Sequence, residues 1–243
     1  MNKKQISKLC LVITGCISPN NDVPQLQLRD SKERRTQYIN SIKYYLEKTN
    51  IQNIVFCDNS EAVLDGELIK IAQKYGKQFE WISFSGNSEK CIQCGKGYGE
   101  GEIIEYAMKN SKLLHASDVM LKITGRMSIR NIDRIIKLAN VKRNYFYPVV
   151  QEGGKPFVCT KMFIVQKPVF KRFFVDEYNK VNDMEHNYIE HVYGGIIKNN
   201  KFSVSIIPLN PMIYGVSGTT GEVYSPKMYK QVWYTIRMHI FRR

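Results

Sequence analysis

The stretch IQNIVFCDNS, residues 51–60, decides the fold, because it joins a short apolar run to a polar turn. A run this short that is bounded by turn residues predicts a buried strand rather than a helix. The run ends in Asp58, Asn59 and Ser60, whose side chains favour turns. The sequence therefore predicts a buried strand with polar side chains at its carboxyl end.

The segments on both sides of this strand alternate between strand and helix patterns. Residues 9–13 form another short apolar run, and residues 31–48 carry apolar side chains at helical spacing. Residues 61–76 again have a helical pattern, and residues 79–86 have the pattern of a third strand. This order predicts a single α/β domain with a mixed, mostly parallel sheet, since crossover connections between parallel strands are right-handed.

A glycine-rich segment, GKGYGEG at 95–101, precedes a helical pattern and a further apolar run at 119–123. We expect a turn whose bare backbone N–H groups bind phosphate, and a tight loop without a ligand fits the residues equally well. In an open parallel sheet, ligands bind beyond the carboxyl ends of the strands. Asp58 with Asn59, the 95–101 segment and residues 122–126 are therefore expected to meet in one crevice.

Three cations, Lys122, Arg126 and Arg130, lie at and beyond the end of the 119–123 run. A lysine inside an apolar strand needs an anionic partner or access to solvent. One interpretation is that Lys122 and Arg126 neutralise a diphosphate, which arginine binds through paired hydrogen bonds. The alternative is that Arg126 and Arg130 lie on the solvated face of a helix at 128–140.

The second half of the chain carries a second group of polar residues. A helical pattern at 184–199 includes Glu185, His186 and Glu190. We expect Glu185 to act as a general base whose pKa is raised by burial, and the alternative is a surface helix with ordinary ion pairs. Residues 210–226 are expected to form a turn-rich loop, whose glycine-rich part at 215–221 closes over a ligand.

Charge is strongly biased, with 36 lysines and arginines against 22 aspartates and glutamates, a net charge of +14 among 243 residues. This bias favours phosphate-rich partners such as nucleic acid, nucleotides or an anionic membrane. Residues 226–243 place apolar side chains on one helical stripe and contain no acidic residue. We expect a domain at 1–225 and a basic amphipathic tail that binds an anionic membrane; the alternative is a helix packed back on the domain.

The first 20 residues contain an apolar run too short for a signal peptide or a membrane span, so we expect a cytoplasmic protein. Of the six cysteines, only Cys91 and Cys94 have the spacing of metal ligands. Zinc would need a second pair or histidines to complete four ligands, and no partner pair stands out. No metal site is therefore expected.

The order of these segments resembles the GT-A fold of nucleotide-sugar glycosyltransferases, a Rossmann-like fold. IVFCDNSE at 54–61 is similar to the acidic turn after that family's second strand, and DMEHNYIEH at 183–191 is similar to its acceptor-side acidic motif. The chain also resembles small bacterial transferases that build capsule and lipopolysaccharide glycans, through its GKGYGE and KITGR segments. Where the family has a metal-binding Asp-x-Asp motif, this chain has Lys122 to Arg126, which offer no carboxylate to a divalent metal.

The resemblance implies an enzyme that moves a sugar from a nucleotide-diphosphate donor to a hydroxyl of a glycan or lipid-linked acceptor in surface polysaccharide synthesis. Without the metal ligands, we expect an inverting, metal-independent glycosyltransferase that needs no cofactor and lies peripherally on the inner face of the plasma membrane. The alternatives are a nucleic-acid-binding α/β protein and a nucleotide-dependent phosphotransferase. The first is disfavoured because the basic residues are spread out, and the second because a Walker lysine-serine pair is absent.

These implications assign roles to individual residues. Glu185, Lys122 and Arg126 are the expected catalytic residues, and His186 is expected to bind the acceptor. The expected donor-binding residues are Thr14, Asp58, Asn59, Lys96, Gly97, Gly99, Glu100, Lys122, Arg126, Ser217 and Gly218.

Overall fold

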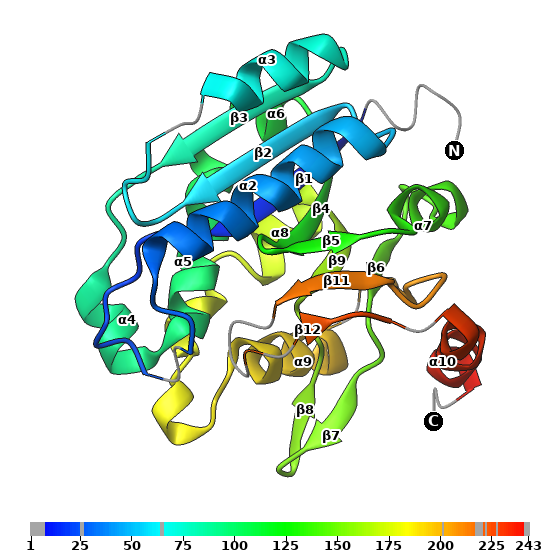
Figure 1. The fold of residues 1–243 in the computed structure, drawn as a ribbon. Helices are drawn as coiled ribbons and strands as arrows, with labels where there is room; N and C mark the ends of the chain where they lie inside the picture. The colour runs from blue at the N-terminus through cyan, green and yellow to red at the C-terminus, as the bar shows by residue number, and fades with distance from the viewer. Residues whose placement is uncertain are drawn as a thin grey trace.

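A computed structural model of the chain describes residues 8–24, 27–63, 66–200, 202–216, 221, 223–226 and 228–240. Among them, a seven-stranded sheet with the order β10-β6-β9-β4-β1-β2-β3 forms the centre (Figure 1). Its strands are β1 (Leu9–Gly15), β2 (Asn53–Asp58), β3 (Gln78–Ser83), β4 (Val119–Thr124), β6 (Asn144–Phe146), β9 (Met162–Gln166) and β10 (Val204–Ile206). Only β9 runs antiparallel to its neighbours, so the predicted mixed, mostly parallel sheet is confirmed.

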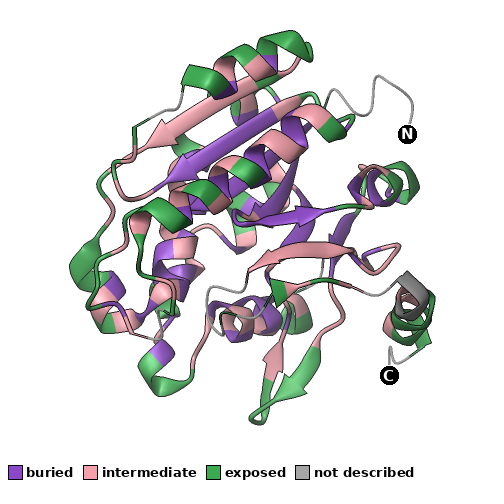
Figure 2. Cartoon of the chain, viewed as in Figure 1, coloured by how far each residue is buried: buried purple, intermediate pink, exposed green. Residues whose placement is uncertain are grey.

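Helices cover both faces of this sheet, and Figure 2 shows the buried strands between their exposed outer surfaces. One face carries α2 (Ser31–Lys48), α3 (Gly66–Lys74) and α7 (Ile132–Leu138). The other carries α5 (Lys96–Asn110), α6 (Lys112–His115), α8 (Lys167–Phe173) and α9 (Ile189–Asn199). The chain therefore has two apolar cores, one on each side of the sheet.

Strand alternation decides which core each side chain of β4 enters. Leu121 and Ile123 enter the core beneath α2, whereas Met120 enters the core beneath α5. Since successive side chains of a strand point to opposite faces, Lys122 shares the face of Met120. The lysine is thereby directed toward α5 rather than toward solvent.

Two predictions about residues 95–140 are corrected. The glycine-rich segment is not a turn, because α5 begins at Lys96 directly after Gly95, whose φ is 93°. The helix at 128–140, which the alternative interpretation of Arg126 and Arg130 assumes, begins only at Ile132, because residues Met127–Ile129 form strand β5 and pair with β11 (Ile213–Val216). Pairing with a distant segment has overridden the local helical pattern there.

Two predictions in the second half are corrected as well. The expected loop at 210–226 contains β11 and β12 (Val223–Tyr224), which join β5 in a three-stranded antiparallel sheet. The expected helix at 184–199 is split, because the 3-10 helix η2 (Asp183–Glu185) ends at His186, whose φ is 54°. Helix α9 then starts at Ile189. The remaining elements are α4 (Ser88–Cys94), the hairpin of β7 (Val150–Glu152) and β8 (Lys155–Phe157), and the 3-10 helix η1 (Glu177–Lys180).

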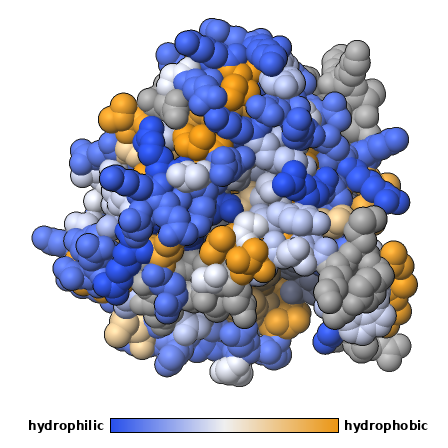
Figure 3. Space-filling view, in the orientation of Figure 1, coloured by the Kyte–Doolittle hydropathy of each residue, from blue (hydrophilic) through white to orange (hydrophobic). Residues whose placement is uncertain are grey.

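Helix α10 (Met228–Ile240) is the predicted C-terminal helix, and it is held to the domain along one side. Two hydrogen bonds from Asn210 hold this side. Its backbone N–H donates to Thr235 Oγ1 at 3.0 Å, and its side chain donates to Gln231 Oε1 at 2.7 Å. Val232, Trp233, Ile236 and Ile240 are between 48% and 67% exposed on the other sides, where Figure 3 shows apolar side chains gathered at the edge of the molecule. Among the described residues, no helix has the length and apolar content to span a membrane.

Candidate active site

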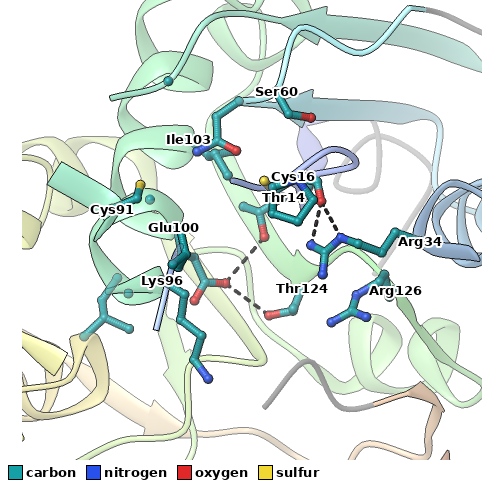
Figure 4. Close-up of a pocket in the computed structure, with 18 of the residues that line it drawn as sticks. Thr14, Cys16, Arg34, Ser60, Cys91, Lys96, Glu100, Ile103, Thr124 and Arg126 are labelled. Atoms are coloured by element: carbon teal, nitrogen blue, oxygen red, sulfur yellow. Dashed lines mark hydrogen bonds between the residues drawn. The ribbon is translucent and has the colours of Figure 1, made fainter. Parts of the chain in front are cut away.

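A cavity of about 660 Å³ lies at the carboxyl ends of β1, β2 and β4 and reaches the start of α5. The predicted crevice beyond the strand ends is thus present, and Figure 4 shows side chains from these elements around it. Of the expected binding residues, those on its wall are Thr14, Asn59, Lys96, Gly97, Gly99, Glu100 and Arg126. Asp58, Lys122, Glu185 and His186 are not on the wall, and Ser217 and Gly218 lie outside the described residues.

Asp58 is a buried organiser of the loops around the cavity. Its side chain is fully buried, and Oδ2 accepts a hydrogen bond from Ile17 N at 2.7 Å. Oδ1 accepts from both the backbone N–H and the hydroxyl of Ser60, each at 2.8 Å. Because both oxygens are occupied, Asp58 ties the loop after β1 to the loop after β2. The expected contact between Asp58 and a ligand is corrected to this indirect role.

The turn after Asp58 forms part of the cavity wall. Asn59 donates from its backbone to Gly15 O at 3.2 Å, and Gly86 donates to Asn59 O at 3.0 Å. Glu61 follows with a φ of 56°, a left-handed conformation that is uncommon outside glycine and is frequent at functional sites. The carboxyl ends of three adjacent strands are in this way held together at the cavity.

The glycines of α5 allow close packing rather than backbone freedom. A Cβ added to Gly97 would lie 3.1 Å from Asp183 Oδ1, and one added to Gly99 would lie 2.9 Å from Cys91 Sγ. At Gly101 an added Cβ would clash with Tyr178. The glycine-rich sequence therefore brings the first turns of α5 against η1, η2 and α4, with Lys96 and Glu100 facing the cavity.

Lys122 has its anionic partner inside the protein. Its side chain is fully buried, and Nζ contacts the Glu100 carboxylate. Nζ also donates to Thr160 O at 2.7 Å and to Thr124 Oγ1 at 3.1 Å. An ammonium group has three N–H donors, so all of them are used. The expected direct contact between Lys122 and a diphosphate is therefore corrected.

Arg126 and Arg34 present two buried cations to the same cavity (Figure 4). Arg126 is 7% exposed and Arg34 is 4% exposed, and their guanidinium carbons lie 6.0 and 5.9 Å from the centre of the Tyr38 ring. No described carboxylate forms an ion pair with either arginine. Burial lowers the pKa of the Arg126 guanidinium, although arginine stays charged at neutral pH.

These arginines bind neutral groups instead. Arg34 donates to Cys16 O from Nε at 2.9 Å and from a terminal nitrogen at 2.5 Å, to Leu28 O at 3.0 Å and to the Tyr38 hydroxyl at 3.4 Å, so most of its donors are used and its positive charge is what it contributes to the cavity. Arg126 donates to Gln37 Oε1 at 3.3 Å. Two like charges that are buried together without a carboxylate are costly, and a bound anion would offset that cost. The two guanidinium groups make this end of the cavity chemically suited to an anionic ligand.

Glu185 and His186 lie away from the cavity. Both are exposed, and the His186 ring contacts the Tyr188 hydroxyl at 2.9 Å. The break before α9 turns these two residues outward and leaves Asp183, Tyr188 and Glu190 on the cavity wall. Since a general base must reach the group that it deprotonates, Glu185 is replaced by Glu190 as the candidate base.

The surroundings of Glu190 change the pKa of its carboxylate. Thr160 Oγ1 donates to Glu190 Oε1 at 2.8 Å. Burial and the negative charge of Glu100 raise the pKa of Glu190 above its ordinary value, against smaller opposing effects that include Thr160 and Lys122. A carboxylate with a raised pKa is a stronger base once it is ionised. The position suits proton abstraction from a ligand in the cavity.

Three further charged residues surround this end of the cavity. Burial raises the pKa of Asp183, whose Oδ2 accepts from Gly97 N at 3.2 Å. Burial lowers the pKa of Lys96, partly against the attraction of Asp183, Glu190 and Glu100. For Lys161, burial acts to lower the pKa, but the hydroxyl of Tyr224 and nearby anionic groups outweigh it and raise the pKa. This end of the cavity therefore contains both carboxylates and lysines, whereas the arginine end has no carboxylate ion pair among the described residues.

The donor set does not fit a divalent metal. Such an ion needs several oxygen ligands, and the end of β4 supplies Lys122 and Arg126 with Thr124 between them. The adjacent Glu100 carboxylate is already held by Lys122. Within the described part of the chain, no group of three or more histidine, cysteine, aspartate or glutamate side chains could hold an ion, and Cys91 and Cys94 are free thiols.

Sequence reasoning missed Arg34, Tyr38 and Thr160. Arg34 and Tyr38 lie four residues apart on α2, on the face that also buries Ile42 and Tyr45. An arginine on the apolar face of a helix was the available signal. Thr160 carries no such signal, because it acts through its backbone carbonyl and its hydroxyl between two distant residues, Lys122 and Glu190.

Comparison with known proteins gives no sequence relative: no family model matches the chain, and no curated protein matches it. Solved structures with a similar course include the mannosyltransferase Ktr4p of S. cerevisiae, at 9% identity over 95% of this chain and 81% of that one, with a TM-score of 0.47. The glycosyltransferase GlyE of Streptococcus pneumoniae TIGR4 matches at 10% identity over 81% of this chain and 44% of that one, with a TM-score of 0.47.

A third structure is a glycosyltransferase involved in the glycosylation of the major capsid of PBCV-1, with 11% identity over 81% of each chain and a TM-score of 0.44. Each of these three proteins is described as a glycosyltransferase or a mannosyltransferase, the class that the sequence resembles. Because every identity is 11% or lower and every TM-score is below 0.5, the functional assignment rests on the site itself.

Proposed function

We propose that this chain is a glycosyltransferase that moves a sugar from a nucleotide-diphosphate donor to a hydroxyl of a glycan or lipid-linked acceptor. The observation that carries the proposal is the pair of buried arginines, Arg34 and Arg126, which line the cavity without a carboxylate partner among the described residues. Guanidinium groups match the oxygens of a diphosphate, and their burial strengthens the interaction. The role in surface polysaccharide synthesis rests on the resemblance of the GKGYGE and KITGR segments.

The reaction follows from the two ends of the cavity. Glu190 accepts the proton of the acceptor hydroxyl as its oxygen attacks the anomeric carbon of the sugar. The bond from that carbon to the diphosphate breaks, and the electron pair leaves with the diphosphate. Arg34 and Arg126 stabilise the charge that develops on this leaving group. A single base opposite the leaving group implies inversion at the anomeric carbon.

We propose that catalysis does not require a divalent metal. The support is the donor set at the end of β4, where residues 122–126 include no carboxylate and Arg126 lines the cavity. EDTA should therefore leave the turnover rate within about twofold, because no step depends on a bound ion. A rate that vanished with EDTA and returned with Mg²⁺ or Mn²⁺ would contradict this part of the proposal.

We also propose that α10 binds the cytoplasmic face of an anionic membrane, close to a lipid-linked acceptor. Val232, Ile236 and Ile240 recur at helical spacing and are exposed together with Trp233, and Arg237 lies beside the Trp233 ring. Apolar side chains enter the headgroup region while cations meet anionic lipid. Tyr229, which the stripe also includes, has no described side chain.

Vesicle sedimentation tests the membrane contact. The protein should sediment with vesicles of phosphatidylglycerol and phosphatidylcholine, and the double variant Trp233→Ser/Ile236→Ser should bind at least about tenfold more weakly, since two apolar anchors are lost. Equal binding of both proteins would overturn the assignment. Turnover with a water-soluble acceptor should be unchanged, because Trp233 and Ile236 do not line the cavity.

The transferase proposal is tested by thermal unfolding with a panel of ligands. UDP-glucose, UDP-galactose, GDP-mannose, UDP and GDP are each added at fixed ionic strength, and ATP and a short oligonucleotide serve as controls. At least one nucleotide sugar and its nucleoside diphosphate should raise the Tm, because a ligand that binds only the native state stabilises it. Stabilisation by the oligonucleotide alone would favour a nucleic-acid-binding protein, and stabilisation by ATP alone a phosphotransferase.

A further inference from the structure

The two oxygens of the Glu100 carboxylate have different surroundings. Oε1 contacts Lys122 Nζ and accepts hydrogen bonds from Thr124 Oγ1 at 3.1 Å and from Thr14 Oγ1 at 3.4 Å (Figure 4). No described residue donates a hydrogen bond to Oε2. The side chain is 20% exposed, and Glu100 lines the cavity. One oxygen is therefore fixed by the protein, while the other has no hydrogen-bond donor among the described residues.

Lys122 is suited to hold this carboxylate rather than to bind a ligand. It is fully buried, and Thr160 O and Thr124 Oγ1 accept its remaining hydrogen bonds at 2.7 and 3.1 Å. Its ammonium also lies 5.8 Å from the centre of the Phe163 ring, which stands opposite it on β9. The ammonium therefore has one well-defined position behind Glu100.

The open oxygen selects the kind of group that can bind. An ionised carboxylate accepts hydrogen bonds and donates none, so it suits a hydroxyl group and repels a phosphate. Phosphate is instead favoured at the arginine end of the cavity. A nucleotide sugar that places its diphosphate at Arg126 and Arg34 therefore directs its sugar ring toward the end that carries Glu100 and Glu190.

We propose that Glu100 binds a hydroxyl group of the transferred sugar through Oε2, and that Lys122 is a positioning residue that fixes this carboxylate. The inference rests on the proposed transferase function and deepens it. It makes Glu100 a determinant of sugar specificity: the donor must carry a free hydroxyl at the ring position that meets Oε2. A site built to hydrogen-bond a hydroxyl discriminates strongly against an analogue that lacks it.

Deoxygenated donors provide the test. The UDP- or GDP-sugar that the protein turns over is compared with its analogues deoxygenated at each ring position in turn, and kcat/KM is measured for each. For one position, the wild-type ratio of parent to deoxy analogue should be about tenfold or more, as expected for a hydrogen bond to a charged group. Glu100→Gln should reduce that ratio severalfold and leave the ratios at other positions unchanged.

Two controls separate specificity from structure. Glu89→Gln, which removes an exposed carboxylate of α4 that does not line the cavity, should keep every ratio. The Kd of UDP or GDP should stay within about twofold in Glu100→Gln, because the arginine end is intact. A general loss of folded protein lowers all rates together and leaves the ratios unaffected.

Lys122→Met tests the positioning role, because the same single ratio should fall although Glu100 is still present. If that variant does not fold, the double variant Glu100→Gln/Lys122→Met removes both buried charges and should show the same lowered ratio. Unchanged ratios in Glu100→Gln would overturn the inference while leaving the transferase function standing. Failure of the wild-type protein to bind or turn over any nucleotide sugar would instead overturn the proposed function.

Discussion

Lys122 and Arg126 lie four residues apart at the end of β4, and both are buried cations, yet their surroundings differ. Lys122 has a carboxylate partner and two neutral acceptors inside the protein. Arg126 has only neutral hydrogen-bond partners, Gln37 and the Tyr38 hydroxyl, and a second arginine nearby, with no carboxylate partner among the described residues. The same type of charge is neutralised internally at one position and left for a ligand at the other.

This difference shows that burial alone does not identify a ligand-binding cation. A buried charge with an internal counter-ion contributes to the structure or positions another group. A buried charge that faces a cavity without a counter-ion has a cost that a bound anion removes. Glu190 lies at the end of the cavity near Lys122, because Thr160 accepts a hydrogen bond from Lys122 and donates one to Glu190.

The largest expected effect concerns the chemistry on the Lys122 side of the cavity. Glu190→Gln should lower kcat by about 10² to 10⁴-fold, because a positioned general base contributes that much. The KM for the donor should change little, since the diphosphate lies at the arginine end. Glu185→Gln is the matched control and should keep full activity, because Glu185 is exposed and away from the cavity. The opposite result, with Glu185 essential and Glu190 dispensable, would reverse the assignment of the base.

The next effect compares the two cations directly through stability. Lys122→Met leaves the Glu100 charge without its partner and should lower the free energy of unfolding by roughly 3 kcal/mol. Arg126→Met removes a buried charge that has no carboxylate partner, so the free energy of unfolding should change by less than about 1 kcal/mol or rise. Urea unfolding of both variants without ligand measures the difference. Equal destabilisation by both substitutions would contradict the proposed difference between Lys122, which has an internal carboxylate partner, and Arg126, which has none among the described residues.

A smaller effect is expected in the pH dependence. Glu190 must be ionised to accept a proton, so kcat should fall as the pH is lowered through its raised pKa, above the ordinary value of 4.5. The Glu100 charge is one cause of that increase, after burial. Glu100→Gln should therefore move the acid limb of the profile to lower pH. The charged groups of Lys122, Lys96 and Asp183 near Glu190 remain in this variant. A limb that moved to higher pH would contradict the coupling between the two carboxylates.

The sequence predicts the parts of the molecule that depend on local pattern. The apolar runs at 9–13, 51–57 and 119–123 became β1, β2 and β4, because their burial follows from composition and length. The polar residues beyond those strands met in one cavity, because parallel strands end at the same edge of the sheet.

The errors occurred where distant segments determine the local structure. Residues Met127–Ile129 form a strand because β11 pairs with them, and nothing near them in the sequence indicates that pairing. The sequence pattern favours Glu185 over Glu190 because it predicts one continuous helix, whereas His186 breaks that helix. The sequence predicts a ligand as the partner of Lys122, whereas the partner is Glu100 on helix α5. Sequence pattern supplied the candidate charges, and only the fold decides which of them neutralise each other.

Calorimetric titration with UDP and GDP in the presence of EDTA tests the central claim, that the arginine end binds the diphosphate, most directly. The wild-type protein should bind one of these nucleotides, and Arg126→Met and Arg34→Met should each raise its Kd by about ten- to a hundredfold, because each removes a buried positive charge from the arginine end. Glu185→Gln should bind like the wild-type protein. An unchanged Kd in both arginine variants, with folding intact, would contradict the account.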